Sequence, residues 1–591
     1  MQRTNTCGEL TAKEIGKKAF LCGWVDVRRD HGGVIFIDLR DRYGITQAVF
    51  NPDKKFFKEA EHLRREDCIG VSGKIRSRPE GMKNPKMRTG EIEVVADELF
   101  IYNRSEVPPL TVDDEHPANE DMRMRYRYLD LRRPSMQKKL AMRHEAAQAA
   151  RAYLSSKNFL EIETPLLVRA TPEGARDYVV PSRVHPGNFY ALPQSPQLYK
   201  QILMCSGVDR YFQLPRCLRD EDLRMDRQPE HTQIDVEMSF PSLEDLWETG
   251  EGVIKAVFEK CANKKIKAPF RRIPHKEAAE RYGTDKPDLR YGLLLSDVTE
   301  IINKSDFQVF KNITKDGGIV KAINPEKDLT RKEIEDYTSF VQQLGAKGLA
   351  WVKVNGKALE SNIAKFFGKE TQEELIKKIG AKDKSTIFFM AGSLKNVNQY
   401  LDKLRQKMAA DFKLYDPDEF EFCWIINFPL FEWNEEEDKW DPAHHMFCMP
   451  FEEDMKYLET DPGKVCCTQF DLVLNGIELA SGSLRINRPE VQERVMNVIG
   501  LDKKAAERKF GFLLEAFKYG APPHGGFGMG FDRIVALMAG TNDIREVIAF
   551  PKNKAAQCLM DNSPSEIEPI QMKELHIKIE AEKAGKKEDK K

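Results

Sequence analysis

The chain has almost no excess of charge, because its 93 Lys and Arg residues face 94 Asp and Glu residues. Any contact with a nucleic acid must therefore depend on local basic patches rather than on overall charge. No apolar run approaches the ~18 residues that a membrane helix needs. The polar start MQRTNTCGEL also lacks the apolar stretch of a signal peptide. We expect a protein without a membrane contact, in the cytoplasm.

Cysteine is too scattered for a metal centre or a disulfide scaffold. The eleven cysteines stand singly, except for Cys466 and Cys467. No CxxC or Cys/His spacing suits zinc, and neighbours in sequence rarely form a disulfide with each other. Reduced, buried thiols in a cytosolic enzyme are the expected state. The sequence shows no internal repeat.

A chain of 591 residues is expected to form several domains, since single cores stop growing near ~250–300 residues. Five short strand patterns at the start favour a small β-barrel of the OB type. A charged, proline-bearing linker follows, and then a helical pattern over residues 137–159. The predicted divisions are 1–105 (barrel), 106–136 (linker), 137–285 and 421–556 (two halves of one domain), 286–420 (an inserted domain) and 557–591 (a C-terminal extension with a charged tail).

Two distant motifs contain the residue types that a nucleotide site needs. Arg219 and Glu221 are one residue apart and point the same way if they lie on a strand. The alternating glycines from Gly525 to Gly530 allow the backbone to approach a flat ligand closely. Arg533 follows them with a guanidinium that can lie on a purine or bind a phosphate. Each motif alone is a weak indication of such a site.

Two further segments bring polar side chains together. Ser195, Gln197 and Lys200 lie close to one turn, although a surface loop before an ordinary helix has the same pattern. In residues 216–240, two strands joined by a charged loop would carry Arg219 and Glu221 on one side and Gln233, Asp235 and Glu237 on the other, so that these groups can converge on one site. A cation in this segment, such as Arg219, would reduce the repulsion between a carboxylate nucleophile and an anionic phosphate. A solvated hairpin with salt bridges is the alternative.

The second half of the split domain offers a pair of histidines and a pair of carboxylates. His444 and His445 are adjacent and point apart, which does not suit a shared metal, and a solvated pair remains an alternative. Asp471 and Glu478 supply the oxygen ligands that Mg²⁺ prefers. Seven residues separate them, so the Asn475-Gly476 turn has to bring them together.

Taken together, the segments around Arg219 and Arg533 resemble motifs 2 and 3 of the class II aminoacyl-tRNA synthetases. FLEIETPLL, with Pro165, resembles motif 1, which forms the dimer interface in that family. The similarity to bacterial-type aspartyl-tRNA synthetases extends essentially from end to end. It implies an α+β multidomain fold, with an OB-fold barrel and an antiparallel-sheet catalytic domain split by an inserted α/β domain. It also implies a homodimer that joins L-aspartate to tRNA with ATP and Mg²⁺, through an aspartyl-adenylate.

The resemblance assigns roles to individual residues. Those implied in catalysis are Arg219, Glu221 and Arg533. Those implied in aspartate binding are Glu173, Ser195, Gln197, Lys200, Arg219, Gln233, Asp235, His444, His445 and Arg485. Those implied in ATP binding are Arg219, Asp220, Glu221, Gln228, His231, Glu478, Gly530, Phe531, Asp532 and Arg533. The implied metal ligands are Asp471 and Glu478. Arg485 would bind the aspartate side chain through a bidentate fork, which asparagine could not match.

The barrel resembles the anticodon module, with Arg29 and Gln47 at positions for phosphate or base-edge contacts. Phe36 is a candidate stacking platform for an unpaired base, although a core aromatic has the same pattern. His31 and Gly81 resemble the relaxed members of the family, which charge both tRNA-Asp and tRNA-Asn. A relaxed enzyme implies a downstream amidotransferase that converts Asp-tRNA-Asn. A strict enzyme for tRNA-Asp alone is the alternative.

The chain departs from the family pattern at three places. HHMFC stands for the usual HHPFT, ASGS stands for GGGS, and His231 stands for the phenylalanine that stacks on adenine. The last change predicts an ATP affinity that is weaker or depends on pH. A sibling specificity for asparagine or lysine would share the fold, and a non-catalytic RNA-binding paralogue would keep the barrel. The retained Arg219 and Glu478 favour an enzyme, because RNA binding needs neither.

Overall fold

The computed structural model describes residues 2–171 and 175–580, which form two compact units. Unit 1 comprises the residues up to 143 together with 545–566, and unit 2 comprises 144–544 and the residues from 567. Within the described residues, no helix is both long and apolar enough to cross a membrane. Residues 545–556, expected in the second half of the split domain, and residues 557–566, expected in the C-terminal extension, both belong to unit 1.

Unit 1 contains the predicted OB-type barrel, which closes in the strand order β1-β2-β3-β5-β4. Its strands are β1 (Lys18–His31), β2 (Val34–Asp41), β3 (Gly44–Phe50), β4 (Cys68–Ser77) and β5 (Ile92–Asn103). Along β2, Ile35, Ile37 and Leu39 are fully buried in the barrel core. Phe36 lies on the other face, because successive strand residues alternate. The five strands expected from the sequence are confirmed.

The segment expected to be a linker is partly helical. It contains α2 (Glu120–Arg125) and α3 (Arg127–Asp130), and α4 (Pro134–Ser156) begins within it. Arg127 is 3% exposed, binds Asp130 at 2.6 Å, and donates hydrogen bonds to the backbone oxygens of Ile548 and Ala549. Charges in the segment that was expected to be a linker, such as Arg127 and Asp130, are therefore paired and buried within unit 1.

The central sheet of unit 2 has nine strands in the order β12-β18-β21-β22-β23-β11-β9-β6, with β10 paired to β11. The strands are β6 (Leu160–Glu161), β9 (Arg210–Gln213), β10 (Arg216–Leu218), β11 (Glu230–Ser239), β12 (Arg271–Pro274), β18 (Phe422–Pro429), β21 (Cys466–Leu474), β22 (Ile477–Leu484) and β23 (His524–Gly530). The run from β18 to β9 is antiparallel, and only the flanking pairs β12–β18 and β6–β9 are parallel. This is the expected antiparallel catalytic sheet.

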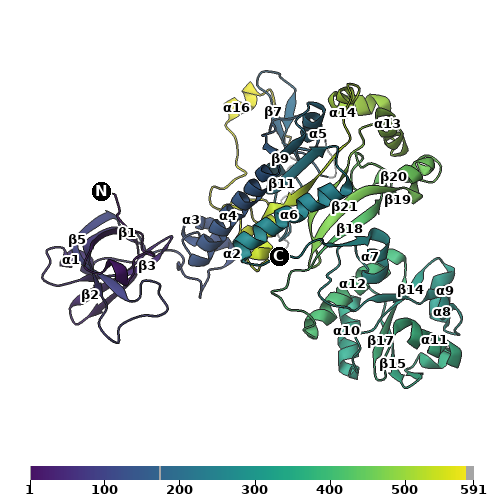
Figure 1. The fold of residues 1–591 in the computed structure, drawn as a ribbon, viewed down its shortest axis with the longest axis horizontal. Coiled ribbons are helices and arrows are strands. Elements are labelled where there is room, and N and C mark those ends of the chain that lie inside the picture. Colours follow the sequence, from purple (N-terminus) through teal and green to yellow (C-terminus); the bar gives the residue numbers. More distant parts are fainter. Residues whose placement is uncertain (1, 172–174, 581–591) are drawn as a thin grey trace, which may run out of the picture. The chain divides into compact units, whose positions relative to one another are not determined.

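Helix α6 (Leu243–Ala262) covers one face of this sheet (Figure 1). Gly250 of α6 lies against the ring of Trp424, and Glu251 accepts a hydrogen bond from the Trp424 indole nitrogen. Met529 of β23 approaches Gly250 from the same face. Strand residues alternate, so Gln233, Asp235 and Glu237 of β11 point to the opposite face. The polar side chains predicted from the sequence are therefore free of α6.

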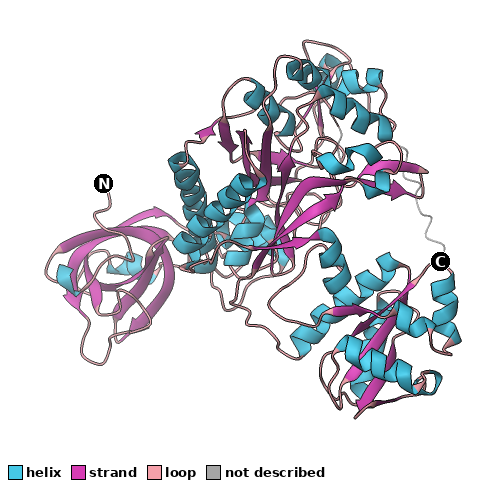
Figure 2. Cartoon of the chain, turned by 45° about the vertical axis from the view of Figure 1, so that its right-hand side comes forward, coloured by secondary structure: helices cyan, strands magenta, loops and turns pink. Residues whose placement is uncertain are grey.

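The inserted domain has a sheet of its own, in the order β13-β14-β17-β15-β16. Its strands are β13 (Leu295–Asp297), β14 (Ile319–Ile323), β15 (Ala350–Asn355), β16 (Ala358–Glu360) and β17 (Thr386–Gly392). Two separate apolar cores lie on its two faces. Helices α10 (Arg331–Gln343) and α12 (Leu394–Asp411) cover one, and α8 (Thr299–Asn303), α9 (Gln308–Lys315) and α11 (Lys369–Ile379) cover the other (Figure 2). Helix α7 (His275–Tyr282) precedes this domain.

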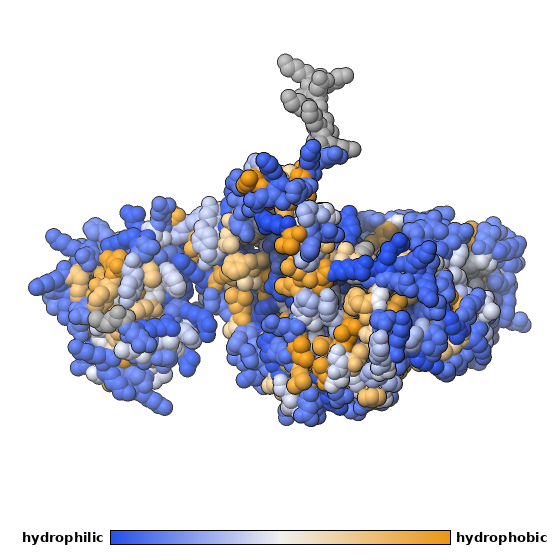
Figure 3. All heavy atoms as spheres, turned by 90° about the horizontal axis from the view of Figure 1, so that it is seen from above, coloured by the Kyte–Doolittle hydropathy of each residue, from blue (hydrophilic) through white to orange (hydrophobic). Residues whose placement is uncertain are grey.

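The remaining elements of unit 2 lie around the site or near the C-terminus. They are β7 (Val179–Pro181), β8 (Phe189–Ala191), α5 (Gln197–Cys205), β19 (Phe431–Asn434), β20 (Lys439–Pro442), α13 (Pro489–Val498), α14 (Lys503–Phe517), α15 (Phe531–Met538) and α16 (Pro569–Glu574). Apolar side chains gather in several places on the mainly hydrophilic surface (Figure 3). Near the predicted motif 1, Leu160, Leu166 and Leu167 are each more than half exposed.

Candidate active site

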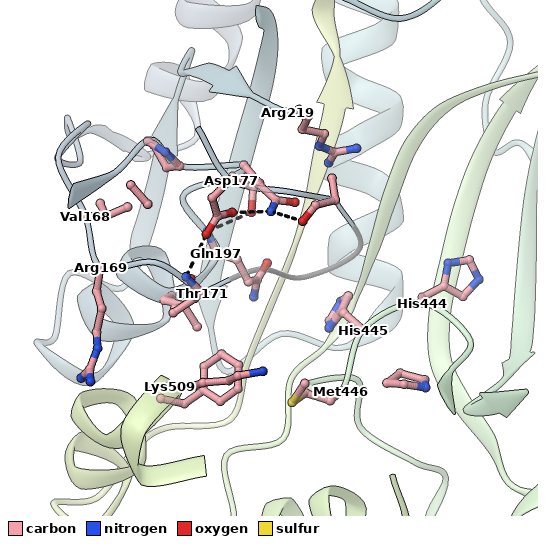
Figure 4. A pocket seen from close by; sticks show the side chains of 18 of the residues that line it. Val168, Arg169, Thr171, Asp177, Gln197, Arg219, His444, His445, Met446 and Lys509 are labelled. Atoms are coloured by element: carbon pink, nitrogen blue, oxygen red, sulfur yellow. Dashed lines mark hydrogen bonds between the residues drawn. The ribbon is translucent and has the colours of Figure 1, made fainter. Parts of the chain in front are cut away.

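A cavity of about 790 Å³ opens on the face of the central sheet that α6 does not cover. Strands β11, β22 and β23 form its floor, and α5 and the loop with His444 and His445 line it as well. A second cavity of about 920 Å³ adjoins it and shares Arg219, Glu478 and both histidines. In Figure 4 the two histidines lie across this second cavity from Asp177 and Gln197. The sequence-predicted residues therefore converge from segments that are far apart in the chain.

Four buried charged side chains form an ion cluster at the first cavity, which Lys200, Asp235 and Arg485 line directly. Lys200 Nζ lies 2.9 Å from Asp235 Oδ1 and 3.1 Å from Glu237 Oε2, and Arg485 Nε lies 3.0 Å from Glu237 Oε1. Each of the four is at most 3% exposed. Burial alone would raise the pKa of Glu237, but Arg485 and Lys200 outweigh it and lower the pKa to about 2. Two cations and two anions therefore balance inside the protein.

The guanidinium of Arg485 already has a partner for each of its donors. Nε and Nη2 donate to the Glu237 carboxylate, Nη2 also donates to the Gly526 carbonyl, and Nη1 lies 2.9 Å from both Ser483 Oγ and His445 Nε2. The bidentate fork expected for substrate thus binds Glu237 here. An incoming carboxylate would have to replace His445 or Ser483 at Nη1, because an arginine has only five N–H donors.

Two buried polar atoms lining the cavity, Arg219 Nε and Asp235 Oδ2, have no hydrogen-bond partner among the described residues. Buried polar atoms nearly always have partners, so an unpartnered donor and an unpartnered acceptor in one cavity indicate a polar ligand. Arg219 can bind an anion and Asp235 can bind an ammonium group. Burial raises the pKa of Asp235, and Lys200 offsets only part of this effect.

The prediction that Arg219 and Glu221 share a strand is wrong, since β10 ends at Leu218. The Arg219 amide still bonds to the Pro229 carbonyl, and both side chains line the cavity. Asp220 was expected at the ATP site but lines neither cavity and is 3.6 Å from Arg176 on the surface. Asp220 pairs with Arg176 instead, through an isolated bridge of the two backbones and the contact between their side chains.

Arg533, at the start of α15, and His231, on β11, both line the first cavity. Arg533 Nη1 donates to the Glu478 backbone oxygen at 2.9 Å, and Nη2 lies 3.1 Å from Asp226 in the loop after β10. Burial, followed by the charges of Arg219 and Arg533, lowers the pKa of His231 to about 3. The imidazole is therefore neutral at physiological pH, and the expected pH dependence of ATP affinity has no source in this residue.

Of the ATP-binding residues predicted at the end of β23 and the start of α15, all but one line the cavity. Gly530 and Asp532 line the cavity, and Asp532 accepts a hydrogen bond from the Thr232 amide. Phe531 does not line it: the side chain is 2% exposed, in the apolar core under α15. A helix buries the residues of one face. Phe531 lies on the face of α15 that packs into the apolar core, whereas Asp532 and Arg533 lie on the side of the cavity.

Not every glycine of the motif serves a ligand. A Cβ on Gly526 would lie 2.1 Å from Glu237 Oε2 and 2.0 Å from the Val236 carbonyl oxygen. The missing side chain therefore makes room for the carboxylate that binds Arg485. At Gly528 the nearest atom would be Gln233 Oε1 at 3.2 Å, and at Gly530 it would be part of Arg533 at 3.6 Å. Only these last two glycines line the cavity.

The Asn475-Gly476 turn does bring Asp471 and Glu478 close. Both turn residues have positive φ, 50° and 85°, and β21 pairs with β22 through this hairpin. Burial and the nearby Glu478 raise the pKa of Asp471 to about 8. Asp471 is 1% exposed, lies behind Glu478 and does not line the cavity, so only Glu478 faces it directly.

These carboxylates suit Mg²⁺ in the way it usually binds beside a nucleotide. Within the described part of the chain, no three His, Cys, Asp or Glu side chains form a group that could hold a metal. Mg²⁺ usually takes one or two carboxylates and completes its shell with waters and substrate phosphates. Glu478, with Asp471 behind it, fits that pattern, and a divalent cation would offset the burial and the Glu478 charge that raise the pKa of Asp471. The adjacent histidines do not contribute a third ligand.

The remaining predicted residues can also be placed. Ser195, Gln197, Gln228 and Gln233 line the cavity. His444 packs edge-on against Phe428. Glu173 lies outside the described residues. Sequence reasoning missed Lys286, whose Nζ lies 2.9 Å from Glu478 Oε2, and Gln469, which bonds Asp471. No local pattern around Lys286 marks it, because its partner lies on a distant strand.

The outer face of the barrel holds the predicted anticodon residues. Arg29 forms a bidentate pair with Asp38 and also donates to Gln47, which in turn donates to Glu93. Phe36 is half-buried beside His31, with ring centroids 6.2 Å apart, and is not part of the barrel core. Gly81 lies in an open turn with φ +81° and no atom within 4 Å of a built Cβ.

Two family models match the chain. The model described as "tRNA synthetases class II (D, K and N)" matches residues 119–554, and "OB-fold nucleic acid binding domain" matches residues 19–102. The solved asparaginyl-tRNA synthetase of Pyrococcus horikoshii, in complex with asparaginyl-adenylate, superposes with a TM-score of 0.59 at 18% identity. The match covers 96% of this chain and 100% of that one. At this identity it supports the fold alone.

Sequence relatives match at much higher identity. The Aspartate–tRNA(Asp/Asn) ligase of Desulfatibacillum aliphaticivorans is 50% identical over 99% of both chains. The enzyme of the same name from Treponema denticola is 51% identical over 98% of this chain and 99% of its own. The Aspartate–tRNA ligase of Bacillus licheniformis is 48% identical over 98% of each. With a family model over most of its length and these full-length relatives, the chain belongs to the class II tRNA synthetases of the D, K and N group.

Proposed function

We propose that the protein activates L-aspartate with ATP and transfers it to both tRNA-Asp and tRNA-Asn. The observation that supports this most directly is the cavity that holds an unpartnered arginine nitrogen and an unpartnered aspartate oxygen beside a balanced, buried ion cluster. Such a site suits a ligand with both an anionic and a cationic group. The names of the two relatives at 50% and 51% identity support both tRNA substrates.

The reaction has two steps. The α-carboxylate of aspartate attacks the α-phosphorus of ATP, and the bond to pyrophosphate breaks. The terminal ribose hydroxyl of tRNA then attacks the acyl carbon, and AMP leaves. No protein nucleophile is needed, because positioning and charge stabilisation suffice. Bound Mg²⁺ would be held by Glu478, with Asp471 behind it, and would neutralise phosphate charge.

In this reaction Arg219 binds the anionic α-phosphate region through its unpartnered Nε. Asp235 holds the substrate ammonium group through Oδ2, so that the α-carboxylate faces the nucleotide. Arg485 binds the side-chain carboxylate at Nη1 after His445 moves away. Asparagine could accept a hydrogen bond at Nη1 through its amide oxygen, but it would bring no negative charge to the guanidinium and would lose the charge-assisted bond that aspartate forms. Arg533 and His231 lie where the purine is expected.

On the barrel, Phe36 offers its half-buried ring to an unpaired anticodon base, and Arg29 and Gln47 flank it. Stacking of this kind contributes ~1–3 kcal/mol per base. His31, next to Phe36, and the open Gly81 turn support acceptance of both anticodons. The exposed Leu160, Leu166 and Leu167 around Pro165 support a homodimer at motif 1. A cell with this enzyme then needs an amidotransferase for Asp-tRNA-Asn.

Charging of separate transcripts with labelled aspartate tests the proposal. We expect tRNA-Asp and tRNA-Asn to be charged at comparable rates and tRNA-Lys not to be charged. Charging of tRNA-Asp alone would leave a strict enzyme and contradict the relaxed choice of tRNA. Charging of neither tRNA would contradict the proposed activity.

A further inference from the structure

Lys286 joins the ATP side of the cavity to the inserted domain. Its Nζ lies 2.9 Å from Glu478 Oε2, and its side chain lines the cavity. It lies in residues 283–293, the segment that leads from α7 into the inserted sheet. The turn at Gly476 packs on the same segment, since a Cβ there would lie 3.5 Å from Asp288 Cβ and 3.7 Å from the Lys286 carbonyl oxygen. Lys286 therefore lies at the turn that joins β21, which carries Asp471, to β22, which carries Glu478.

A buried lysine of the inserted domain binds the last turn of α7, directly before this segment. Lys321 of β14 is 1% exposed, and its Nζ donates to the carbonyl oxygens of Ala279 and Glu280 at 3.0 and 2.9 Å. It also donates to Asn398 Oδ1 of α12 at 2.7 Å. These carbonyls lie in the last turn of α7, where a cation is favourable. The end of α7 is therefore fixed to the inserted domain.

A buried arginine binds the end of the segment. Arg405 of α12 is fully buried and donates to the carbonyl oxygens of Asp288, Tyr291 and Gly292 at 2.8, 3.1 and 3.0 Å. Its guanidinium carbon lies 4.3 Å from the ring centroid of Tyr291 and 5.0 Å from that of Tyr282. Burial of a charged group is costly unless such partners compensate for it. These contacts hold the backbone of residues 288–293 against α12.

We propose that Lys286 is a positioning residue of the ATP site and that the inserted domain sets its position through Lys321 and Arg405. This inference rests on the proposed function. In the free protein Lys286 neutralises Glu478, so a divalent cation must compete with it for that carboxylate. Once displaced, the ammonium group remains beside the phosphates that ATP brings. The inserted sheet and its helices thereby influence nucleotide binding, although the residue that lines the cavity is Lys286 in the segment before them.

The first test compares Lys286→Met with Lys286→Arg in the full-length protein. Without ATP, we expect Lys286→Met to bind Mn²⁺ about fivefold more tightly, as measured by water-proton relaxation, because the competing ion pair is gone. In pyrophosphate exchange we expect its KM for ATP to rise by about the same factor, with kcat and the KM for aspartate changed less. Lys286→Arg should restore both values. Lys357→Met, at the exposed β15–β16 turn, is the matched control.

The second test addresses the role of the inserted domain. Arg405→Lys keeps the charge but loses donors to the backbone, and we expect it to raise the KM for ATP. Combined with Lys286→Met it should add no further rise, since both act through one residue. A further rise of equal size would overturn the coupling, and wild-type Mn²⁺ affinity and KM in Lys286→Met would overturn the whole inference. Loss of aspartate-dependent exchange in the wild type would instead contradict the proposed function, while the Mn²⁺ comparison would still stand.

Discussion

Replacement of Glu237 by Gln tests whether the buried ion cluster stabilises the catalytic unit. Glu237 is fully buried, bonds to Arg485 and lies 3.1 Å from Lys200 Nζ. Gln has nearly the same volume, so the change removes charge without opening a cavity. The cluster then keeps two cations but only one anion, Asp235. Leaving a buried charge without its partner costs about 3–5 kcal/mol.

Thermal unfolding measures this cost. With ~2 °C per kcal/mol for larger domains, we expect Glu237→Gln to lower the Tm of the catalytic unit by about 6–10 °C. Because Glu237 has a pKa of about 2, the loss should be the same at every pH from 6 to 8. Saturating aspartate, an anion, should recover more stability in the variant than in the wild type, since ligand binding to the folded state stabilises it.

The matched control is Glu277→Gln, which removes the same charge from an exposed pair. Glu277 lies 2.7 Å from Arg281 on α7, with both side chains more than a third exposed. Pairs of this kind contribute at most about 1 kcal/mol, so the Tm should hardly move. If Glu237→Gln unfolds within 2 °C of the wild type, or loses no more than the control, then the cluster does not stabilise the unit and our account of it is wrong.

Three further changes follow from the site and from unit 1. Arg219→Ala should slow aspartate-dependent pyrophosphate exchange by the equivalent of about 2–4 kcal/mol and leave tRNA binding by filter assay intact, whereas near-normal exchange would refute its role. His231 should contribute no pH dependence to the KM for ATP between pH 6 and 8, because its pKa is about 3; a transition near pH 6.5 that Phe at this position abolishes would contradict this. Burial alone would raise the pKa of Glu546, but Arg123 and Lys139 lower it to about 2, so its stabilising effect is full above pH ~4.3 and disappears as pH falls toward 2. Urea unfolding at pH 5 and pH 3 should therefore show a smaller loss for Glu546→Gln than for the wild type.

The sequence predicted those features that depend on neighbouring residues. The barrel strands and α4 follow from local periodicity, and the Asn475-Gly476 turn follows from the φ values that it requires. Lys200 and Asp235 were assigned to one site through a family resemblance, and the sheet does bring them together. Their burial is visible only in the folded chain.

Features that depend on distant contacts or on side-chain direction were not predictable. Arg485 was expected to present its fork to substrate, but Glu237 occupies that fork. Phe531 and Asp220 stand beside true lining residues, yet a helix start and a loop turn them away from the cavity. Lys286 lies far from Glu478 in sequence, and nothing in its own segment indicates the pairing.

The missing side chain at Gly526 makes room for the Glu237 carboxylate, so a redesign of this enzyme has to consider positions 526 and 237 together. A methyl group at 526 would collide with both the Glu237 carboxylate and the Val236 carbonyl oxygen, which belongs to the backbone and cannot swing aside. Shortening residue 237 would remove only the first of these collisions and would also leave Arg485 unpaired. A library that varies the two sites one at a time will therefore find mostly inactive clones at each. Altered amino-acid specificity has to be sought elsewhere, at the His445 side of the arginine, where a loop rather than a sheet supplies the neighbours.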